Sequence, residues 1–282
     1  MIPRACVIGW PVEHSRSPVI HRYWLAQYGI DGAYEKEAVK PEDLPGFLQQ
    51  LWTHGYVGAN VTLPHKEAAL GAARSADEAA ITIGAANTLW LDPDGTLHAS
   101  NTDAYGFITN LDAEAPQWNA ATGAVMVLGA GGAARAILYG LIAAGVPRIL
   151  LANRTKARAE TLAAAFGPRI EIIDWEARNA ALAPCGLLVN ATSLGMSGQA
   201  PLDMDLSAMP RDGVVADIVY VPLETELLAA ARAQGLACVD GLGMLLHQAV
   251  PEFERWFGVR PEVTPELKAH VMADVMATLG EE

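Results

Sequence analysis

Cysteine is scarce in this chain of 282 residues: it has three, at positions 6, 185 and 238, and none of them belongs to a CxxC pair. Disulfide frameworks and structural zinc sites need several cysteines at short, regular spacings. We therefore expect reduced thiols and no bound metal, as in a cytoplasmic protein. The first nine residues also lack the apolar core of a secretory signal peptide, which favours the same compartment.

Long apolar runs and an excess of positive charge are missing as well. A membrane-spanning helix needs about 18 to 20 consecutive apolar residues, and even the alanine-rich stretch 136–152 is interrupted by Pro147 and Arg148. The chain has 19 lysines and arginines against 32 aspartates and glutamates, for a formal net charge of −13. This balance argues against nucleic acid and anionic membranes as main partners. It does not argue against an anionic small molecule, whose binding depends on the charge of the site itself.

What the chain does contain is a glycine-rich turn near its centre. Residues 124–136, AVMVLGAGGAARA, are typical of a strand, a glycine turn and a helix, the context that gives a GxGxxG/A match its meaning. Gly129 would permit the tight turn, Gly131 would let the backbone approach a pyrophosphate, and Ala134 would allow close helix–strand packing. The first amides of the helix would hold the phosphates. The alternative is a glycine-rich turn that binds no ligand.

A basic sequence, NRTKAR at 153–158, follows the next expected strand. A dinucleotide-binding unit that prefers NAD places an acidic residue here for the ribose 2′-hydroxyl, whereas basic residues suit the 2′-phosphate of NADP. An ordinary basic helix start is the alternative. The glycine turn and the basic sequence together predict an NADP site.

Hydroxyl side chains follow the first expected strand, at residues 4–9. Ser15 and Ser17 stand in the loop sequence WPVEHSRSP, beyond the carboxyl end of that strand, where α/β proteins bind ligands. The alternative is that Ser17 is the N-cap of a helix whose first residue is Pro18, and that Ser15 is a solvated loop hydroxyl.

Further polar residues occur at later strand ends. Asn60 and Thr62 share one face of the strand expected over 57–63, and Lys66 begins a helix expected over 66–80. A lysine in this position is more often a solvated surface cation. Asp103 ends the sequence HASNTD and could belong to a site or serve as the N-cap of a helix over 104–111.

The chain resembles the shikimate dehydrogenase family over essentially its whole length. Nine motifs occur in the family's order, and together they are specific where each alone is weak. They are GWPVEHSRSP (9–18), NVTLPHK (60–66), GAANTL (84–89), NTDAYG (101–106), GAGGAARA (129–136), NRTKAR (153–158), NATSLGM (190–196), DIVYVPLETELL (217–228) and GLGMLLHQ (241–248). The resemblance implies NADP-dependent, reversible reduction of 3-dehydroshikimate to shikimate, in chorismate and aromatic amino-acid biosynthesis.

The length suggests about two domains, and the resemblance implies what they are. The fold class is α/β, with an open α/β substrate domain and an inserted Rossmann-like NADP domain, and the active site lies in the cleft between them. We expect the substrate domain at 1–104 and 240–282 and the NADP domain at 105–239. A monomer and a homodimer both remain open.

The resemblance also implies roles for the matching residues, with Lys66 and Asp103 as the catalytic pair. The residues expected to bind the substrate carboxylate and ring hydroxyls are Ser15, Ser17, Asn60, Thr62, Asn87, Tyr220 and Gln248. Those expected to bind the cofactor are Gly129, Ala130, Gly131, Gly132, Ala133, Asn153, Arg154, Thr155, Arg158, Thr192, Ser193, Ile218, Gly241 and Met244. Among these, the two arginines would clamp the 2′-phosphate, and the last three residues would lie near the nicotinamide.

Two residues depart from the family's pattern. Trp10 stands where a small polar residue is common, and Arg22 stands where asparagine is frequent; both would alter the edge of the cleft without removing a catalytic group. Two other functions stay open. One is a quinate/shikimate dehydrogenase that uses NAD, which the arginines of NRTKAR disfavour. The other is a non-catalytic NADP-binding regulatory module, which the intact catalytic pair disfavours.

Overall fold

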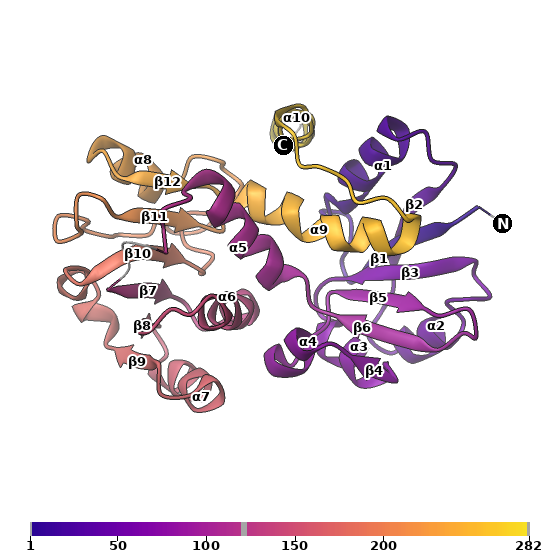
Figure 1. The fold of residues 1–282 in the computed structure, drawn as a ribbon, viewed down its shortest axis with the longest axis horizontal. Helices are drawn as coiled ribbons and strands as arrows, with labels where there is room; N and C mark the ends of the chain where they lie inside the picture. Colours follow the sequence, from indigo (N-terminus) through magenta and orange to yellow (C-terminus); the bar gives the residue numbers. More distant parts are fainter. Residues whose placement is uncertain (1, 120–122, 281–282) are drawn as a thin grey trace. The chain divides into compact units, whose positions relative to one another are not determined.

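The computed structural model describes residues 2–119 and 123–280 and divides into two compact units. The first unit combines the residues up to Thr102 with those from Gln248 onwards, and the second runs from Asp103 to His247 (Figure 1). Each unit contains a six-stranded sheet and helices that pack on it. The α/β fold class expected from the sequence is therefore confirmed.

A mixed sheet forms the centre of the first unit. Its strands are β1 (Arg4–Gly9), β2 (Ala33–Ala38), β3 (Tyr56–Val61), β4 (Ser75–Ala76), β5 (Thr88–Leu91) and β6 (Leu97–Ser100). They lie in the order β2-β1-β3-β5-β6-β4. Strand β1 is parallel to β2 and β3, whereas β5 is antiparallel to both of its neighbours. The carboxyl ends of β1 and β3 therefore meet at one edge of the sheet.

Helices cover both faces of this sheet. On one face, α2 (Leu44–Gln49) and α3 (Lys66–Ala72) share a buried core with Cys6, Ile8 and Leu89 of the strands. On the other face lie α1 (Ser17–Gln27) and the part of α9 (Gly241–Phe257) that belongs to this unit. The long α10 (Pro265–Gly280) packs along α1, where Arg16 and Asp274 form an ion pair at 2.6 Å.

The single helix predicted over residues 66–80 is wrong. Helix α3 ends at Ala72, the short β4 pairs with β6, and α4 (Glu78–Ile83) begins as a separate helix. Asp77 is the N-cap of α4, and its carboxylate accepts a hydrogen bond from the N–H of Ala80 at 2.8 Å. This bond satisfies an amide that the helix itself cannot satisfy, so it favours a new start at this point.

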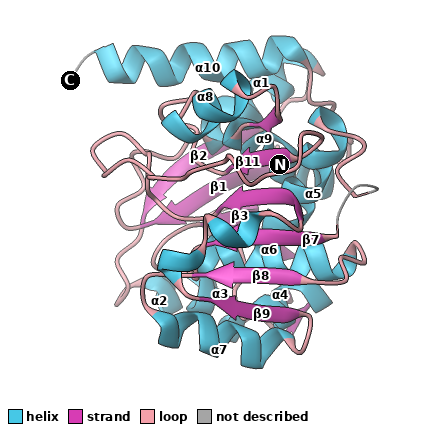
Figure 2. Ribbon diagram, turned by 90° about the vertical axis from the view of Figure 1, so that its left-hand side faces the viewer, coloured by secondary structure: helices cyan, strands magenta, loops and turns pink. Residues whose placement is uncertain are grey.

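The second unit has a parallel sheet with helices wound around it. Its strands are β7 (Ala124–Leu128), β8 (Ile149–Ala152), β9 (Ile170–Ile173), β10 (Cys185–Asn190), β11 (Val214–Asp217) and β12 (Ala237–Val239). They lie in the order β12-β11-β10-β7-β8-β9, and Figure 2 shows β7, β8 and β9 side by side. The helices are α5 (Asp103–Glu114), α6 (Gly132–Ala143), α7 (Lys156–Phe166) and α8 (Glu226–Ala233). This is the strand order of the dinucleotide-binding fold, in which the direction of winding reverses between β7 and β10.

Aromatic rings of the first unit enclose His21. The imidazole is fully buried and stacks on Tyr34 with ring centroids 4.2 Å apart, and the rings of Trp24, Phe253 and Trp256 surround it. Both indole N–H groups donate to backbone carbonyls. Neither ring nitrogen of His21 has a hydrogen-bond partner among the described residues. Burial lowers the pKa of His21 below its ordinary value of 6.5, and a nearby glutamate opposes part of this change.

We expect this imidazole to make the free energy of unfolding decrease as the pH falls below 6.5. A group whose pKa is lower in the folded state takes up a proton on unfolding, so acid favours the unfolded chain, and this contribution disappears above the unfolded pKa. Replacing His21 with phenylalanine should reduce the slope of the free energy of unfolding against pH by up to about 1.4 kcal/mol per pH unit. Denaturant titrations from about pH 8 to pH 5 measure it, with the exposed His54→Phe as control. Equal slopes for His21→Phe and the unsubstituted protein would contradict the prediction.

Candidate active site

The glycine turn leads from β7 into α6. Gly129 has a φ of +105°, which side-chain-bearing residues rarely adopt, and a Cβ there would lie 2.9 Å from the carbonyl oxygen of Ala191. Gly131 is the N-cap of α6, and a Cβ on Gly131 or Gly132 would meet no described atom within 4 Å. Ala134 is fully buried against the sheet. The two glycines at the start of α6 are therefore exposed and uncrowded, as the close approach of a pyrophosphate requires.

The basic sequence follows the carboxyl end of β8. Asn153 donates from its side chain to the backbone carbonyl two residues later, which shapes the turn before α7. Lys156 forms an ion pair with Asp174 at 2.8 Å. Arg154 and Arg158 are exposed, and within residues 2–119 and 123–280 neither has an ion-pair partner. Two guanidinium groups without a carboxylate partner suit a phosphate dianion.

A buried polar network joins the ends of β10 and β11. Asn190 Nδ2 donates to Asp217 Oδ1 at 2.9 Å, and the Thr225 hydroxyl donates to Asp217 Oδ2 at 2.8 Å. The hydroxyl of Thr192 donates to Asn190 Oδ1 at 2.7 Å. Burial raises the pKa of Asp217 above its ordinary value, although its hydrogen bonds oppose the rise. The network fixes the loop that carries two predicted cofactor residues, Thr192 and Ser193.

Helix α9 begins against the end of β11. The Asp240 carboxylate accepts hydrogen bonds from two amides at the start of this helix, at 3.0 and 3.3 Å. A Cβ on Gly241 would collide with the carbonyl oxygen of Ile218. Close packing alone therefore requires a glycine at this position. Ile218 and Met244, which are also predicted to lie near the nicotinamide, are half-buried. Both pack against the hydrophobic core on one face of the second unit's sheet.

Three predicted substrate residues come together in the first unit. Asn60 lies in β3, Asn87 lies just before β5, and Gln248 lies on α9; all three side chains are buried. Asn87 Nδ2 donates to Gln248 Oε1 at 3.2 Å, and Asn60 Nδ2 donates to the backbone carbonyl of Asn87 at 3.3 Å. Each side-chain amide offers donors and an acceptor, so this amide cluster suits a ligand with several hydroxyl groups.

The two predicted serines stand at the start of α1. The backbone N–H of Ser17 donates to Ser15 Oγ at 3.4 Å. The helix begins at Ser17 with Arg16 as its N-cap and no side-chain cap bond, so the N-cap alternative for Ser17 is wrong. The reason is that the carbonyl of Arg16 already accepts the bond that closes the first turn, from Val19 at 3.0 Å.

The predicted catalytic pair occupies two helix starts. Lys66 is the half-buried first residue of α3, and Asp103 is the first residue of α5. Thr62 lies shortly before α3, and its methyl group approaches Gly9 so closely that a Cβ at position 9 would collide with it. This contact joins the segment 62–66 to the end of β1. The loop that carries Ser15 and Ser17, here called the serine loop, starts from the same end. Tyr220 is half-buried in the loop after β11.

Sequence reasoning missed the residues that surround the amide cluster. Tyr34 donates its hydroxyl to Asn60 Oδ1. Thr88 and Thr102 each donate to Glu252 Oε1 at 2.8 Å. Both threonines stand inside motifs quoted for the family, so their positions carried a signal. Tyr34 and Glu252 stand outside the quoted motifs, in segments that carried none.

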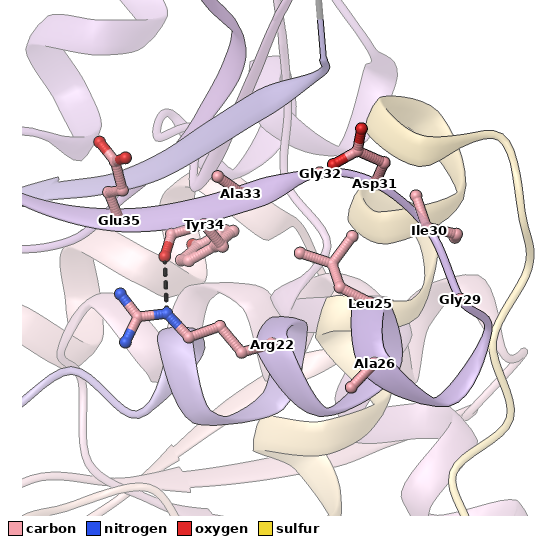
Figure 3. A pocket seen from close by; sticks show the side chains of 10 residues that line it. All are labelled: Arg22, Leu25, Ala26, Gly29, Ile30, Asp31, Gly32, Ala33, Tyr34 and Glu35. Atoms are coloured by element: carbon pink, nitrogen blue, oxygen red, sulfur yellow. Dashed lines mark hydrogen bonds between the residues drawn. The ribbon is translucent and has the colours of Figure 1, made fainter.

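A pocket of about 570 Å³ lies between α1 and β2 (Figure 3). Arg22, one of the two departures from the family's pattern, lines it and donates from Nε to the carbonyl of Tyr34 at 2.9 Å. None of the predicted site residues lines this pocket. Its lining residues are Arg22, Leu25, Ala26, Gly29, Ile30, Asp31, Gly32, Ala33, Tyr34 and Glu35.

The described residues form neither a metal site nor a membrane-spanning helix. Among residues 2–119 and 123–280, no three His, Cys, Asp or Glu side chains gather as a metal site would need. In the same part of the chain, no helix combines the length and the apolar character needed to cross a membrane. The three cysteines are free thiols, of which Cys6 and Cys185 are buried.

Comparison with known families matches most of the chain. The model of the shikimate dehydrogenase substrate binding domain matches residues 7–89, and that of shikimate/quinate 5-dehydrogenase matches residues 113–197. The shikimate dehydrogenase (NADP(+)) of Rhodopseudomonas palustris (strain TIE-1) is 60% identical over 271 residues, which are 96% of each chain. That of Methylocella silvestris is 57% identical over 277 residues, 98% of each chain.

Solved structures agree in fold over nearly all of the chain. Quinate dehydrogenase from Corynebacterium glutamicum in complex with NAD has a TM-score of 0.90 at 30% identity, covering 96% of this chain and 99% of that one. Shikimate 5-dehydrogenase from Thermus thermophilus, in complex with NADP(H) and shikimate, has a TM-score of 0.84 at 36% identity, covering 97% and 100%. From these full-length similarities, the chain belongs to the shikimate dehydrogenase family.

Proposed function

We propose that this chain catalyses the NADP-dependent, reversible reduction of 3-dehydroshikimate to shikimate, a step of chorismate and aromatic amino-acid biosynthesis. The observation that carries the proposal is a sequence identity of 60%, over 96% of each chain, to relatives that are named for this enzyme and this cofactor. The structure from Thermus thermophilus, with the same fold, is a complex with both NADP(H) and shikimate.

The second unit has the features that a bound NADP needs, and we assign the cofactor to it. NADPH supplies the hydride that reduces the substrate's carbonyl carbon. The amides at the start of α6 would hold the pyrophosphate, and Arg154 and Arg158 would bind the 2′-phosphate. The other proposed cofactor residues are Gly129, Ala130, Gly131, Gly132, Ala133, Asn153, Thr155, Thr192, Ser193, Ile218, Gly241 and Met244.

The substrate is assigned to the amide cluster and the serine loop. Ser15 and Ser17, together with Tyr220, would bind the carboxylate of shikimate. Asn60, Thr62, Asn87 and Gln248 would bind its hydroxyl groups. In this scheme residues 1–104 and 240–282 form the substrate domain and residues 105–239 the cofactor domain. We further propose that the protein works in the cytoplasm as a monomer or homodimer.

Lys66 would act as the general acid of the reduction. When hydride reaches the carbonyl carbon, negative charge develops on the oxygen, and a positioned ammonium can stabilise that charge and donate a proton to it. In the reverse direction the neutral amine would accept the proton. Asp103 would orient Lys66 and the substrate hydroxyl.

The test of this function is an absorbance assay at the reduced-nicotinamide band. We expect the protein to reduce NADP rapidly with shikimate, and only weakly with quinate or with NAD. Faster reaction with quinate and NAD would instead favour the activity named for the Corynebacterium structure. A folded protein that binds NADP without turnover would favour a regulatory module.

Lys66→Ala should lower kcat by about 10²- to 10⁴-fold, the usual contribution of general acid–base catalysis, with only a modest rise in KM. Steady-state kinetics measure both, and Lys40→Ala, at an exposed lysine of the same unit, is the control. Near-normal turnover of Lys66→Ala would remove Lys66 from the mechanism.

Arg154→Ala should raise KM for NADP by about 10- to 100-fold, because it removes a charge-assisted contact with the 2′-phosphate. KM for NAD should stay the same, since NAD lacks that phosphate. The matched control is Arg148→Ala, at the other end of β8, where the arginine is paired with Glu171 at 2.6 Å. If Arg154→Ala raised KM for NADP and for NAD by the same factor, a role of Arg154 specific to the 2′-phosphate would be ruled out.

A further inference from the structure

A buried carboxylate lies directly behind the amide cluster. Glu252 is fully buried on α9, and its Oε1 accepts hydrogen bonds from the hydroxyls of Thr88 and Thr102, each at 2.8 Å. Its other oxygen, Oε2, lies 3.7 Å from Nε2 of His21, beyond hydrogen-bond reach. Nothing in the proposed reaction uses this carboxylate, although its burial is costly.

Both threonines stand between Glu252 and the amide cluster. Thr88 Oγ1 is 2.8 Å from Asn87 Oδ1 as well as from Glu252, and Thr102 Oγ1 is 3.4 Å from Gln248 Oε1. A hydroxyl has a single hydrogen, so each threonine can donate to only one of these oxygens at a time. A carboxylate attracts this hydrogen more strongly than an amide oxygen does. The hydrogen of Thr102 therefore turns towards Glu252, whereas the hydrogen of Thr88, which lies between oxygens at equal distance, is shared between Glu252 and Asn87.

This choice fixes the orientation of the neighbouring amide. With its hydrogen directed to Glu252, Thr102 Oγ1 is left to accept, and Asn87 Nδ2 donates to it at 2.8 Å. The backbone N–H of Thr102 donates to Asn87 Oδ1 at 2.9 Å. The Asn87 amide is thus held at both ends, and the hydrogen of Thr102 does not compete with a substrate hydroxyl for the amide oxygens.

We propose that Glu252 is a positioning residue for substrate binding: through Thr102, its buried carboxylate holds the amide of Asn87, which in turn donates to Gln248, in the orientation that receives the substrate's hydroxyl groups. This inference rests on the proposed function, because the substrate is the one assigned there. It adds a residue that touches neither substrate nor cofactor.

The test replaces Glu252 with methionine, which keeps the length of the side chain and removes both acceptor oxygens. The hydrogen of Thr102 must then turn to an amide oxygen, so KM for shikimate should rise by about 3- to 10-fold, the usual range for one net hydrogen bond. The dissociation constant for NADP should not change. Glu252→Gln keeps one oxygen that can accept, so its KM should lie closer to that of the unsubstituted enzyme. Glu254→Met, on the same helix with 44% of its side chain exposed, is the matched control.

The split between KM and kcat separates positioning from folding. A residue that only supports the fold would lower the amount of active enzyme, and hence the apparent kcat, at unchanged KM. An unchanged KM in folded Glu252→Met overturns the proposal, as does a KM for Glu252→Gln as high as that for Glu252→Met. No turnover by the unsubstituted protein would overturn the proposed function and this inference with it.

If Glu252→Met fails to fold, a second variant tests the positioning role of Glu252. Thr102→Val keeps the shape of the side chain but removes both the donor to Glu252 and the acceptor for Asn87. A raised KM for shikimate with unchanged NADP binding supports the proposal, and a KM equal to that of the unsubstituted enzyme overturns it.

Discussion

The pairing of β7 with β10 is the constraint on which the rest of the second unit depends. The two strands are neighbours in the sheet although they are separated along the chain by two other strands, and their register places Leu128 opposite Asn190. The N–H of Ala191 continues the ladder by donating to the carbonyl of Leu128 at 2.8 Å. The chain after β7 must therefore turn away beside Ala191, which accounts for the positive φ and the absent side chain at Gly129.

The first unit is organised by buried polar side chains as much as by its sheet. Amides, hydroxyls and a carboxylate lie on the face that α1 and α9 cover, and each costs free energy unless it is hydrogen-bonded. Tyr34, Thr88 and Thr102 satisfy the amide cluster from the protein side. Such a network stabilises one set of side-chain orientations, which is what recognition of a rigid hydroxylated ring requires.

In the second unit, local patterns in the sequence predicted the strand, the glycine turn and the helix at 124–143 and the strand that follows, and the structure has these elements there. The glycine turn and the basic sequence each predict a phosphate site from a few neighbouring residues, because a phosphate is bound mainly by backbone amides and by charge. Asp217 escaped this reasoning because its partners, Asn190 and Thr225, meet it only in the folded sheet. Of the amide cluster, Asn60 was indicated by its place at a strand end, whereas Asn87 and Gln248 were reached only through the family resemblance.

Other features were hidden for physical reasons. Glu252 is one of two glutamates in α9, and only its burial distinguishes it from the half-exposed Glu254. The helix predicted over 66–80 was wrong because pairing of β4 with β6 and capping by Asp77 outweighed local helix propensity.

The division of the first unit into two chain segments affects the order in which the protein can fold during synthesis. The ribosome releases the six strands of this unit before the second unit, but it makes Phe253 and Trp256, which close over His21 and Gly58, only after the second unit. All residues of the second unit are available before them. Domains generally fold as units while the chain emerges. The inserted unit can therefore be completely folded before Phe253 and Trp256 are available to pack on the sheet of the first unit.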